Sequence, residues 1–256
     1  MLTDPAAIVA IRRSNRALCE QIAQWEPLDY GTAFCSPAFT ALSEANQLRE
    51  VWLESVDGET AFLRAESYYR ERHLTCYRWT PAASQPLDPV EALLLSKGWR
   101  RRDLTVMKLT DIELGRAPVN DAIRILPARA MPKALRQTYA GDGPRAEVRA
   151  ALASERLNDS NYDLFVAMLD GHPAGRIGYL EVGDIARLAS VFVAPNFRRR
   201  GVGLAMAAHF LRLVRRLLPR AVVTCTEAEN TGGLAFLRRC GFTAAGTLIE
   251  FDRPSG

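Results

Sequence analysis

The sequence predicts an α/β (α+β) protein with a mixed, twisted sheet flanked by helices, arranged as two domains in tandem. Short apolar stretches with the period of strands alternate with longer stretches of helical period, the pattern of a layered sheet-and-helix fold. The two halves differ in composition, because all four tryptophans lie in the first hundred residues and no tyrosine follows Tyr179. Residues 110–120, which contain glycine and proline, form the best linker. We therefore expect domains at 1–114 and 121–256.

The first half is predicted to contain three helices, three strands and short extended stretches between Leu28 and Phe39 that are broken by Gly31 and Pro37. Asp4 and Pro5 are an N-cap and a first-turn proline, which together begin a helix. Gly98 ends another helix. Helices are expected at 5–25, 59–72 and 88–97, the second with Phe62, Leu63, Ala65 and Tyr69 facing inward, and strands at 50–54, 74–79 and 99–109.

The second half is predicted to follow the order β-α-α-β-β-β-α-β-α-β. Asp170-Gly171 and Gly183-Asp184 separate apolar stretches, and both pairs are two-residue turns typical of β-hairpins. Strands are expected at 123–127, 162–169, 173–182, 188–193, 221–227 and 242–251, and helices at 132–139, 144–157, 201–219 and 232–239.

The composition is that of a soluble globular protein, with 48% apolar and 24% charged residues. A net charge of +4 is too small to indicate nucleic acid or a membrane surface as a partner. The five cysteines are scattered without a C-x-x-C pair and only three histidines are present, so we expect reduced thiols and no metal site. The N-terminus has no signal segment, and no apolar run approaches the ~20 residues of a membrane span. The chain is therefore predicted to be cytoplasmic.

The most informative stretch is a basic turn with two glycines, between a strand and a helix. The strand 188–193 ends at Pro195, and three arginines and two glycines lead into the long helix: Arg198, Arg199, Arg200, Gly201 and Gly203. Such a turn directs unpaired backbone N–H groups and the positive end of a helix dipole at one place, which favours a phosphate. A P-loop would need a Lys-Ser/Thr pair where Leu204-Ala205 stands, and a Rossmann turn would need a glycine at Met206.

Together with the preceding Val193-Ala-Pro195, the pattern Arg198-x-x-Gly201-x-Gly203 resembles the pyrophosphate-binding signature of the GNAT superfamily of acyl-CoA N-acyltransferases. The order of elements over about 121–253 is also similar to that family. The resemblance implies the acyl-CoA N-acyltransferase fold and acetyl-CoA as co-substrate. It further implies that the following residues bind the cofactor: Val191, Phe192, Val193, Arg198, Arg199, Arg200, Gly201, Val202, Gly203, Leu204 and Asn230.

Each of these residues has an implied role in the family that the chain resembles. The backbone of Val191 and Val193 would pair with the pantetheine arm, and the amides of 199–204 would hold the pyrophosphate. Asn230 would contact the pantetheine end of the cofactor, the alternative being that it only ends a strand or caps a helix. Val191 and Val193 have an alternative too, because their side chains also fit a core strand.

The two halves resemble each other. The motif A-F-L-x-x-x-G-F at 235–242 has the spacing of A-L-L-x-x-x-G-W at 92–99. We interpret the first half as a reduced GNAT-like copy, with chance similarity between short apolar helices as the alternative. Its equivalent turn, S-V-D-G-E at 55–59, is acidic, so an anion would be repelled there. The first half is therefore expected not to hold acyl-CoA.

The acid and base of the family that the chain resembles are not carried over. Many members have a tyrosine four residues before the glycine of the G-F pair, a position that holds Leu237 here. Several have a glutamate six residues before the second valine of the strand, Val193, and that position holds Arg187 here. The candidate bases for a mechanism relayed by water are carboxylates at strand ends and hairpins: Glu181, Asp184, Glu227 and Glu229. Ser190 and Cys240 are candidates for polar contacts, and His209, on a helix face with two arginines, is expected to be exposed.

We expect the protein to transfer an acetyl group from the thioester of acetyl-CoA to a primary amine of a small molecule or peptide, by direct attack of the amine. The alternative is a non-catalytic regulatory module that binds acyl-CoA, which the missing tyrosine and glutamate favour. A nucleic-acid-binding protein is a weaker alternative, because three arginines in one turn without flanking aromatic residues form a poor footprint.

Overall fold

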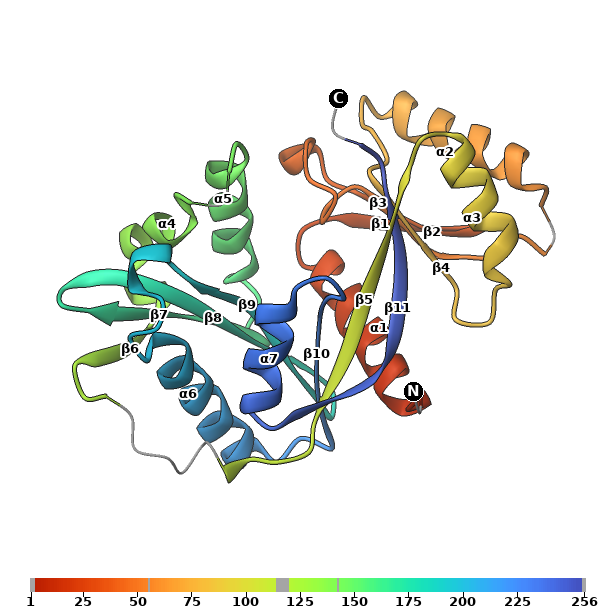
Figure 1. The fold of residues 1–256 in the computed structure, drawn as a ribbon. Coiled ribbons are helices and arrows are strands. Elements are labelled where there is room, and N and C mark those ends of the chain that lie inside the picture. The colour runs from red at the N-terminus through yellow and green to blue at the C-terminus, as the bar shows by residue number, and fades with distance from the viewer. Residues whose placement is uncertain (1–2, 55, 114–119, 142, 255–256) are drawn as a thin grey trace. The chain divides into compact units, whose positions relative to one another are not determined.

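The computed structural model describes residues 3–54, 56–113, 120–141 and 143–254. Its contacts divide the chain into two compact units, each discontinuous in sequence (Figure 1). The C-terminal unit comprises Met1–Ala17 and Thr105–Thr247, and the N-terminal unit comprises Leu18–Leu104 and Leu248–Gly256. The grouping of the first helix with the C-terminal half was not predicted. The domain division at 1–114 and 121–256 stays a prediction, and residues 114–119 of the linker lie outside the described residues.

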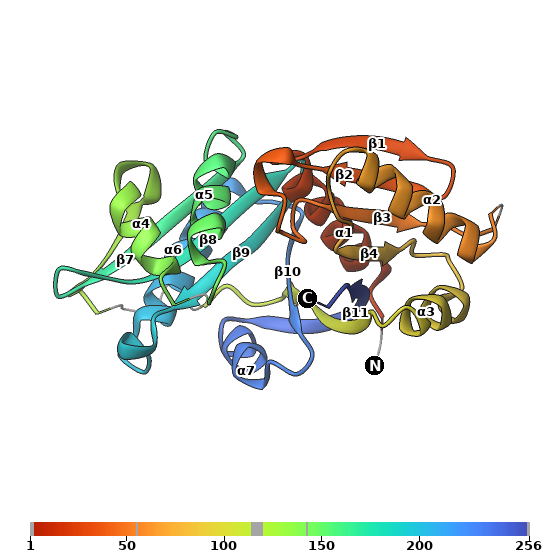
Figure 2. The same cartoon turned by 90° about the horizontal axis from the view of Figure 1, so that it is seen from above.

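The N-terminal unit has its strands in the order β1-β2-β3-β4-β11-β5, with β3 and β4 parallel. Helices α2 and α3 pack on one face, and Figure 2 shows α2 running along the strands. The core is rich in aromatic side chains and includes Tyr69, Trp79 and Trp99. The elements are β1 Gln24–Leu28, β2 Gly31–Cys35, β3 Gln47–Val51, α2 Gly58–Glu71, β4 Arg78–Pro81, α3 Leu87–Ser96 and the beginning of β5 Arg100–Leu109.

Four expectations for this half were wrong in detail, one of them being the strand expected at 50–54, which lies at Gln47–Val51. Leu63 was expected to face inward but is 64% exposed, because it lies on the side of α2 opposite to Ala61 and Ala65. The strand expected at 74–79 is displaced to Arg78–Pro81, since the backbone N–H of Leu74 still closes the end of α2 by donating to the carbonyl oxygen of Tyr69. The first helix ends at Glu20 rather than near residue 25, where β1 has already begun.

The C-terminal unit has its strands in the order β11-β5-β10-β9-β8-β7-β6, with β9 and β10 parallel. Successive residues of β8 point to opposite faces: Arg176 meets Tyr139 at the end of α4, whereas Ile177 packs in the cluster with residues of α6. Figure 1 shows α4 and α6 on opposite faces of this part of the sheet. The elements are α1 Pro5–Glu20, β6 Ile123–Pro127, α4 Pro132–Tyr139, α5 Ala146–Arg156, β7 Tyr162–Leu169, β8 His172–Val182, β9 Ile185–Val193, α6 Val202–Leu217, β10 Ala221–Glu227, α7 Thr231–Arg239 and β11 Phe242–Asp252.

The predicted hairpin between β7 and β8 is confirmed. Asp170 and Gly171 both have positive φ, 53° and 80°, which is the requirement of a type I′ turn. No helix within the described part of the chain combines the length and the apolar character needed to cross a membrane.

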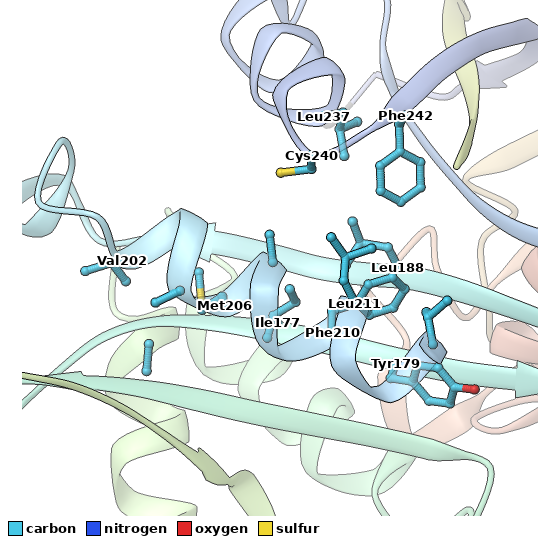
Figure 3. Close-up of a cluster of buried hydrophobic side chains, with 14 of the residues drawn as sticks. Ile177, Tyr179, Leu188, Val202, Met206, Phe210, Leu211, Leu237, Cys240 and Phe242 are labelled. Atoms are coloured by element: carbon cyan, nitrogen blue, oxygen red, sulfur yellow. The ribbon is translucent and has the colours of Figure 1, made fainter. Parts of the chain in front are cut away.

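The core of the C-terminal unit lies between the sheet and the helices α6 and α7. Figure 3 shows Leu237 and Cys240 of α7 above Leu188 of β9, with Met206 and Phe210 of α6 in the same cluster. All five side chains are at least nine-tenths buried. This packing fixes where α6 begins relative to the end of β9, and so positions the candidate site.

Candidate functional site

Strands β9 and β10 separate where β9 approaches its carboxyl end. Their parallel register joins Ile185 to Ala221 and Arg187 to Val223 and is not continued beyond that point. The side-chain hydroxyl of Thr224 then donates to the carbonyl oxygen of Leu188, at 2.9 Å. From residue 189 onward, β9 therefore presents one backbone edge that its neighbour in the described ladder does not cover.

A β-bulge shapes this open part of β9. Gly178 of β8 faces Ala189 and Arg176 faces Phe192, so one residue of β8 is opposed by two of β9. Within the bulge, Ser190 has a φ of 51°, a left-handed conformation that is unusual for a residue other than glycine.

The backbone of β9 alternates in direction after the bulge. The N–H of Ala194 donates to the carbonyl oxygen of Ala174 in β8, at 2.9 Å. Because neighbouring peptide groups of a strand point to opposite edges, the N–H groups of Val193 and Val191 point toward the gap beside β10. These are the backbone groups from which pairing with a pantetheine arm was predicted.

The turn after β9 ends at the N-terminus of α6. Arg199 and Gly201 adopt left-handed conformations, with φ of 63° and 86°, and Gly201 is the N-cap residue. The N–H of Ala205 donates to the Gly201 carbonyl oxygen at 3.0 Å, so the N–H groups of 202–204 precede the first intrahelical bond. A Cβ at Gly203 would lie 3.2 Å from the ring of Phe236. The first turn of α6 therefore leaves its N–H groups without an intrahelical acceptor at the N-terminus, and it packs closely against Phe236 beside Gly203.

The three arginines of this turn lie on the surface around the helix N-terminus. Arg200 pairs with Asp170 at 2.7 Å, and Arg198 donates through Nε to the carbonyl oxygen of Val193 at 3.3 Å. The Val193 carbonyl lies on the same edge as its N–H, so the Arg198 side chain must move if a ligand pairs there. The cationic surroundings predicted for an anion are present, but a bound ligand stays a prediction.

Asn230 caps α7. Its Oδ1 accepts from the N–H of Gly233 at 2.9 Å, and its Nδ2 donates to Oγ1 of Thr226 at 3.0 Å. The capping alternative left open by the sequence is therefore realised, and a contact with a cofactor remains untested.

The candidate bases divide into two groups along β9. Asp184 and Glu181 lie at the β8–β9 hairpin, where β9 begins, and seven residues of strand from Asp184 to Val191 span about 23 Å. Glu227 ends β10 and Glu229 follows it. Because β9 and β10 are parallel, Glu227 lies at about the level of Val191 across the gap. All four carboxylates are exposed, and only the second group lies at the end where β9 is open.

Leu237 and Arg187 stand at the positions where the family that the chain resembles has its acid and its base. Both side chains have structural roles here. Leu237 is buried in the core (Figure 3). Arg187 is 9% exposed; its guanidinium donates to Oγ of Ser14 at 3.1 Å and to the side chain of Asn15, and lies 3.7 Å from the Cys225 sulfur. The side chain of Arg187 therefore ties α1 to the sheet.

The partners in two polar features of this region were not predicted, although a polar contact of Ser190 was expected. Arg176 is buried between the rings of Tyr139 and Phe192, at 3.6 and 4.5 Å, and its guanidinium donates to the carbonyl oxygen of Thr138. It thereby links the end of α4 to β9. The second feature is a hydroxyl pair formed by Tyr162 and Ser190, at 3.0 Å. The only signal in the sequence is polarity within apolar strands, which does not specify a partner.

His209 was expected to be exposed, and this was wrong. Its ring lies 4.5 Å from that of Phe165 on β7, and it is half-buried. Burial, reinforced by Arg212 and Arg216, lowers the pKa of His209 from 6.5 to about 4. The face of α6 that carries it is covered by the sheet, which helical periodicity alone does not reveal.

The lowered pKa of His209 predicts a loss of stability in acid. Between the ordinary pKa and about 4 the unfolded chain binds a proton that the folded chain does not, so stability decreases as the pH falls. We expect the free energy of unfolding to lose about 1 to 2 kcal/mol from this residue between pH 7 and pH 5. His209→Leu should remove that part of the pH dependence in denaturant titrations, and an unchanged dependence would contradict the assignment.

The N-terminal unit repeats this local geometry with the gap closed. Its strand β3 has an extra residue at Glu50, with a φ of 52°, before Val51. Here the carbonyl of Val51 accepts from the N–H of Ala82 at 2.9 Å, and the N–H of Leu53 donates to Oε1 of Gln85 at 2.8 Å. The equivalent backbone edge is therefore occupied by the chain itself.

The helix N-terminus of this copy is also occupied. The Asp57 carboxylate accepts from the N–H of Thr60 at 3.0 Å and so places a negative charge where an anion would bind. Ser55, the first residue of the predicted turn, lies outside the described residues.

Comparison with known proteins gives matches over the C-terminal half. Residues 128–242 match the model of the acetyltransferase (GNAT) family. An uncharacterized N-acetyltransferase of Methanocaldococcus jannaschii is 31% identical over 85 residues, which are 30% of this chain and 38% of that relative. The chain therefore spans well under half the length of this relative.

Solved structures are similar over nearly the whole chain. A functionally unknown conserved protein of Staphylococcus epidermidis has a TM-score of 0.69 at 14% identity, covering 90% of this chain and 93% of its own. A GCN5-related N-acetyltransferase of Kribbella flavida has a TM-score of 0.63 at 14% identity, covering 98% and 96%. A tandem GNAT protein of the clavulanic acid biosynthesis pathway has a TM-score of 0.56 at 16% identity, covering 89% and 80%. At these identities the likeness establishes the fold, including its tandem arrangement.

Proposed function

We propose that the C-terminal unit transfers an acetyl group from acetyl-CoA to a primary amine, because residues 128–242 match the acetyltransferase (GNAT) family. The amine attacks the thioester directly, without a covalent enzyme intermediate. One observation carries the proposal: the uncovered backbone edge of β9 leads directly into the open N-terminus of α6.

The residues of this edge and turn fit the two ends of the co-substrate. The backbone of Val191 and Val193 offers hydrogen bonds of the kind that an extended pantetheine amide makes with a strand. The amides of 199–204, the helix dipole and the arginines suit a diphosphate. Glycine at position 203 lets the first turn of α6 pack closely against Phe236, where a Cβ would lie 3.2 Å from the ring.

The N-terminal unit is proposed to hold no acyl-CoA. Its equivalent backbone edge is satisfied by Ala82 and Gln85, and its equivalent helix N-terminus by Asp57. An acyl-CoA would have to displace all three groups and approach a carboxylate. One molecule of acetyl-CoA per chain is therefore expected in a titration.

The acceptor is proposed to be a small molecule or a peptide with a primary amine, and the compartment to be the cytoplasm. The five cysteines form no disulfide with one another in the structure, and thiols of this kind are usual for proteins of a reducing compartment. A binding module without transferase activity is the second candidate, supported by Leu237 and Arg187 at the positions of the acid and the base.

Release of free thiol from acetyl-CoA, measured with a panel of primary amines, separates the two candidates. A transferase releases thiol in proportion to the acetylated amine found by mass spectrometry. A binding module gives saturable binding of acetyl-CoA in calorimetry and no release above the rate in buffer. Absence of binding would contradict both.

A further inference from the structure

The Tyr162–Ser190 hydroxyl pair lies at the bulge of β9. The two oxygens are 3.0 Å apart although the residues are separated by 28 positions in sequence. Tyr162 is fully buried at the start of β7, and Ser190 is half-buried. This contact joins an interior phenol to a hydroxyl at the residue that immediately precedes Val191.

Glycine at position 178 makes this contact possible. Gly178 lies on β8, between β7 and β9, and a Cβ there would be 2.9 Å from the Tyr162 hydroxyl. The tyrosine therefore reaches across β8 above a residue without a side chain. It does so on the face that carries Arg176 and α4, because Gly178 and Arg176 are two positions apart in one strand.

The conformation of Ser190 is strained. A left-handed conformation costs a residue other than glycine about 1–2 kcal/mol, and such outliers concentrate at functional sites. Glycine would remove the strain, yet the sequence has serine. The equivalent bulge of the N-terminal unit, where the backbone edge is closed, has Glu50 in the same conformation instead.

We propose that Ser190 is the proton relay of acetyl transfer and that Tyr162 is its positioning residue, an inference that rests on the proposed function. The amine nitrogen forms a bond to the acyl carbon as the bond from that carbon to sulfur breaks. A proton leaves the nitrogen for Oγ of Ser190, while the hydroxyl proton of Ser190 passes to the departing sulfur. Tyr162 donates its hydroxyl hydrogen to Oγ and holds it in place. No charge remains on the protein, so the relay needs neither a tyrosine at 237 nor a glutamate at 187.

The kinetic test uses two substitutions that both remove the hydroxyl but differ in whether they leave the backbone strain in place. Ser190→Ala keeps the strained conformation, and Ser190→Gly relieves it. We expect both to lower kcat by about 10²-fold or more, the usual range for proton transfer by a positioned side chain. The Kd for acetyl-CoA from calorimetry should change by about twofold at most. Loss of activity in the alanine variant alone would assign the effect to the backbone and overturn the relay.

Tyr162→Phe tests the positioning role against a matched control. We expect about a tenfold lower kcat with an unchanged Kd for acetyl-CoA, because Ser190 remains but its hydroxyl is no longer held. Tyr179→Phe removes a buried hydroxyl of the neighbouring strand that has no hydrogen-bond partner among the described residues, and should leave kcat unchanged. Equal effects of the two variants would contradict the assignment of Tyr162.

A chemical test asks whether a side chain at position 190 can contact the acyl group of the bound co-substrate, and it does not depend on turnover. In Ser190→Cys, the introduced thiolate should displace bromide from bromoacetyl-CoA and form a thioether to the acyl methylene carbon, located by peptide mass spectrometry. Glu50→Cys places a thiol at the equivalent bulge of the N-terminal unit. Bromoacetyl-CoA should alkylate this thiol no faster than it alkylates a free thiol in solution. No preferential labelling at 190 would overturn the proposal.

The remaining outcomes separate the relay from the transfer itself. If the wild type binds acetyl-CoA but acetylates no amine, both proposals fail. If the wild type is active and Glu227→Gln abolishes activity while the Ser190 variants retain it, a carboxylate is the base and only the relay fails. A dependence of kcat/KM on pH that follows the pKa of the free amine alone, for several amines, supports the relay, since serine does not titrate in this range.

Discussion

Gly203→Val is expected to abolish the rise in melting temperature that acetyl-CoA produces. The new side chain would begin 3.2 Å from the ring of Phe236 and 3.7 Å from Cγ2 of Val193, so it would crowd the first turn of α6, whose N–H groups are proposed to hold the diphosphate. At a ligand concentration of 100 times Kd, bound acetyl-CoA stabilises the folded chain by about 2.7 kcal/mol. All of this stabilisation should be lost.

The control for this experiment is Gly232→Val. Gly232 is the second residue of α7, as Gly203 is of α6, and no contact within 4 Å is found among the described residues for a Cβ placed there. Each variant is compared with its own melting temperature without ligand, so a general loss of stability does not mimic a loss of binding. An undiminished shift in Gly203→Val would contradict a phosphate seat at the start of α6.

Gly241→Ala is expected to unfold the C-terminal unit. A Cβ at this position would lie 1.9 Å from the carbonyl oxygen of Asp111, and its φ of 89° already disfavours a side chain. The clash is with backbone, which cannot rotate away, and that backbone is held by N–H groups of Thr110 and Asp111 that donate to the Gly241 carbonyl. We expect a loss of about 4 kcal/mol or more, which is in the range of exceptional substitutions.

Gly98→Ala is the matched substitution in the N-terminal unit. Gly98 has the same place in the repeated A-x-L-x-x-x-G motif and a φ of 77°, but within the described part of the chain its Cβ position has no contact closer than 4 Å. Only the left-handed conformation is penalised, so we expect a loss of about 1 kcal/mol. Denaturant titrations followed by far-UV circular dichroism compare the two, and equal losses would mean that the Asp111 contact can relax.

Much of the C-terminal half could be predicted because its elements are specified locally. Strands β7 and β10 and helix α4 have the predicted bounds, since each is a periodic segment between turn residues or begins at a proline. The hairpin at Asp170 depends on two positive φ values, which Asp-Gly supplies. In the N-terminal half the strands are short and Leu63 is exposed, because apolar character alone does not decide which side of a helix is covered.

The candidate site was predictable where it consists of backbone. A proline that ends a strand and glycines that begin a helix specify where N–H groups are uncovered, whatever ligand they bind. The partners of side chains were not predictable. Ser190 meets Tyr162, and His209 meets Phe165, from strands that are distant in sequence.

The sequence by itself therefore determined the order of the elements in the C-terminal half, the basic turn and the match of residues 128–242 to the acetyltransferase (GNAT) family. Tertiary structure alone decided that β9 and β10 separate after Arg187, that Ser190 is left-handed beside a tyrosine, and that the edge of β3 is closed by Gln85. The physical reason is range: propensities and turn chemistry act over a few residues, whereas the exposure of a strand edge depends on which remote segments come to lie beside it.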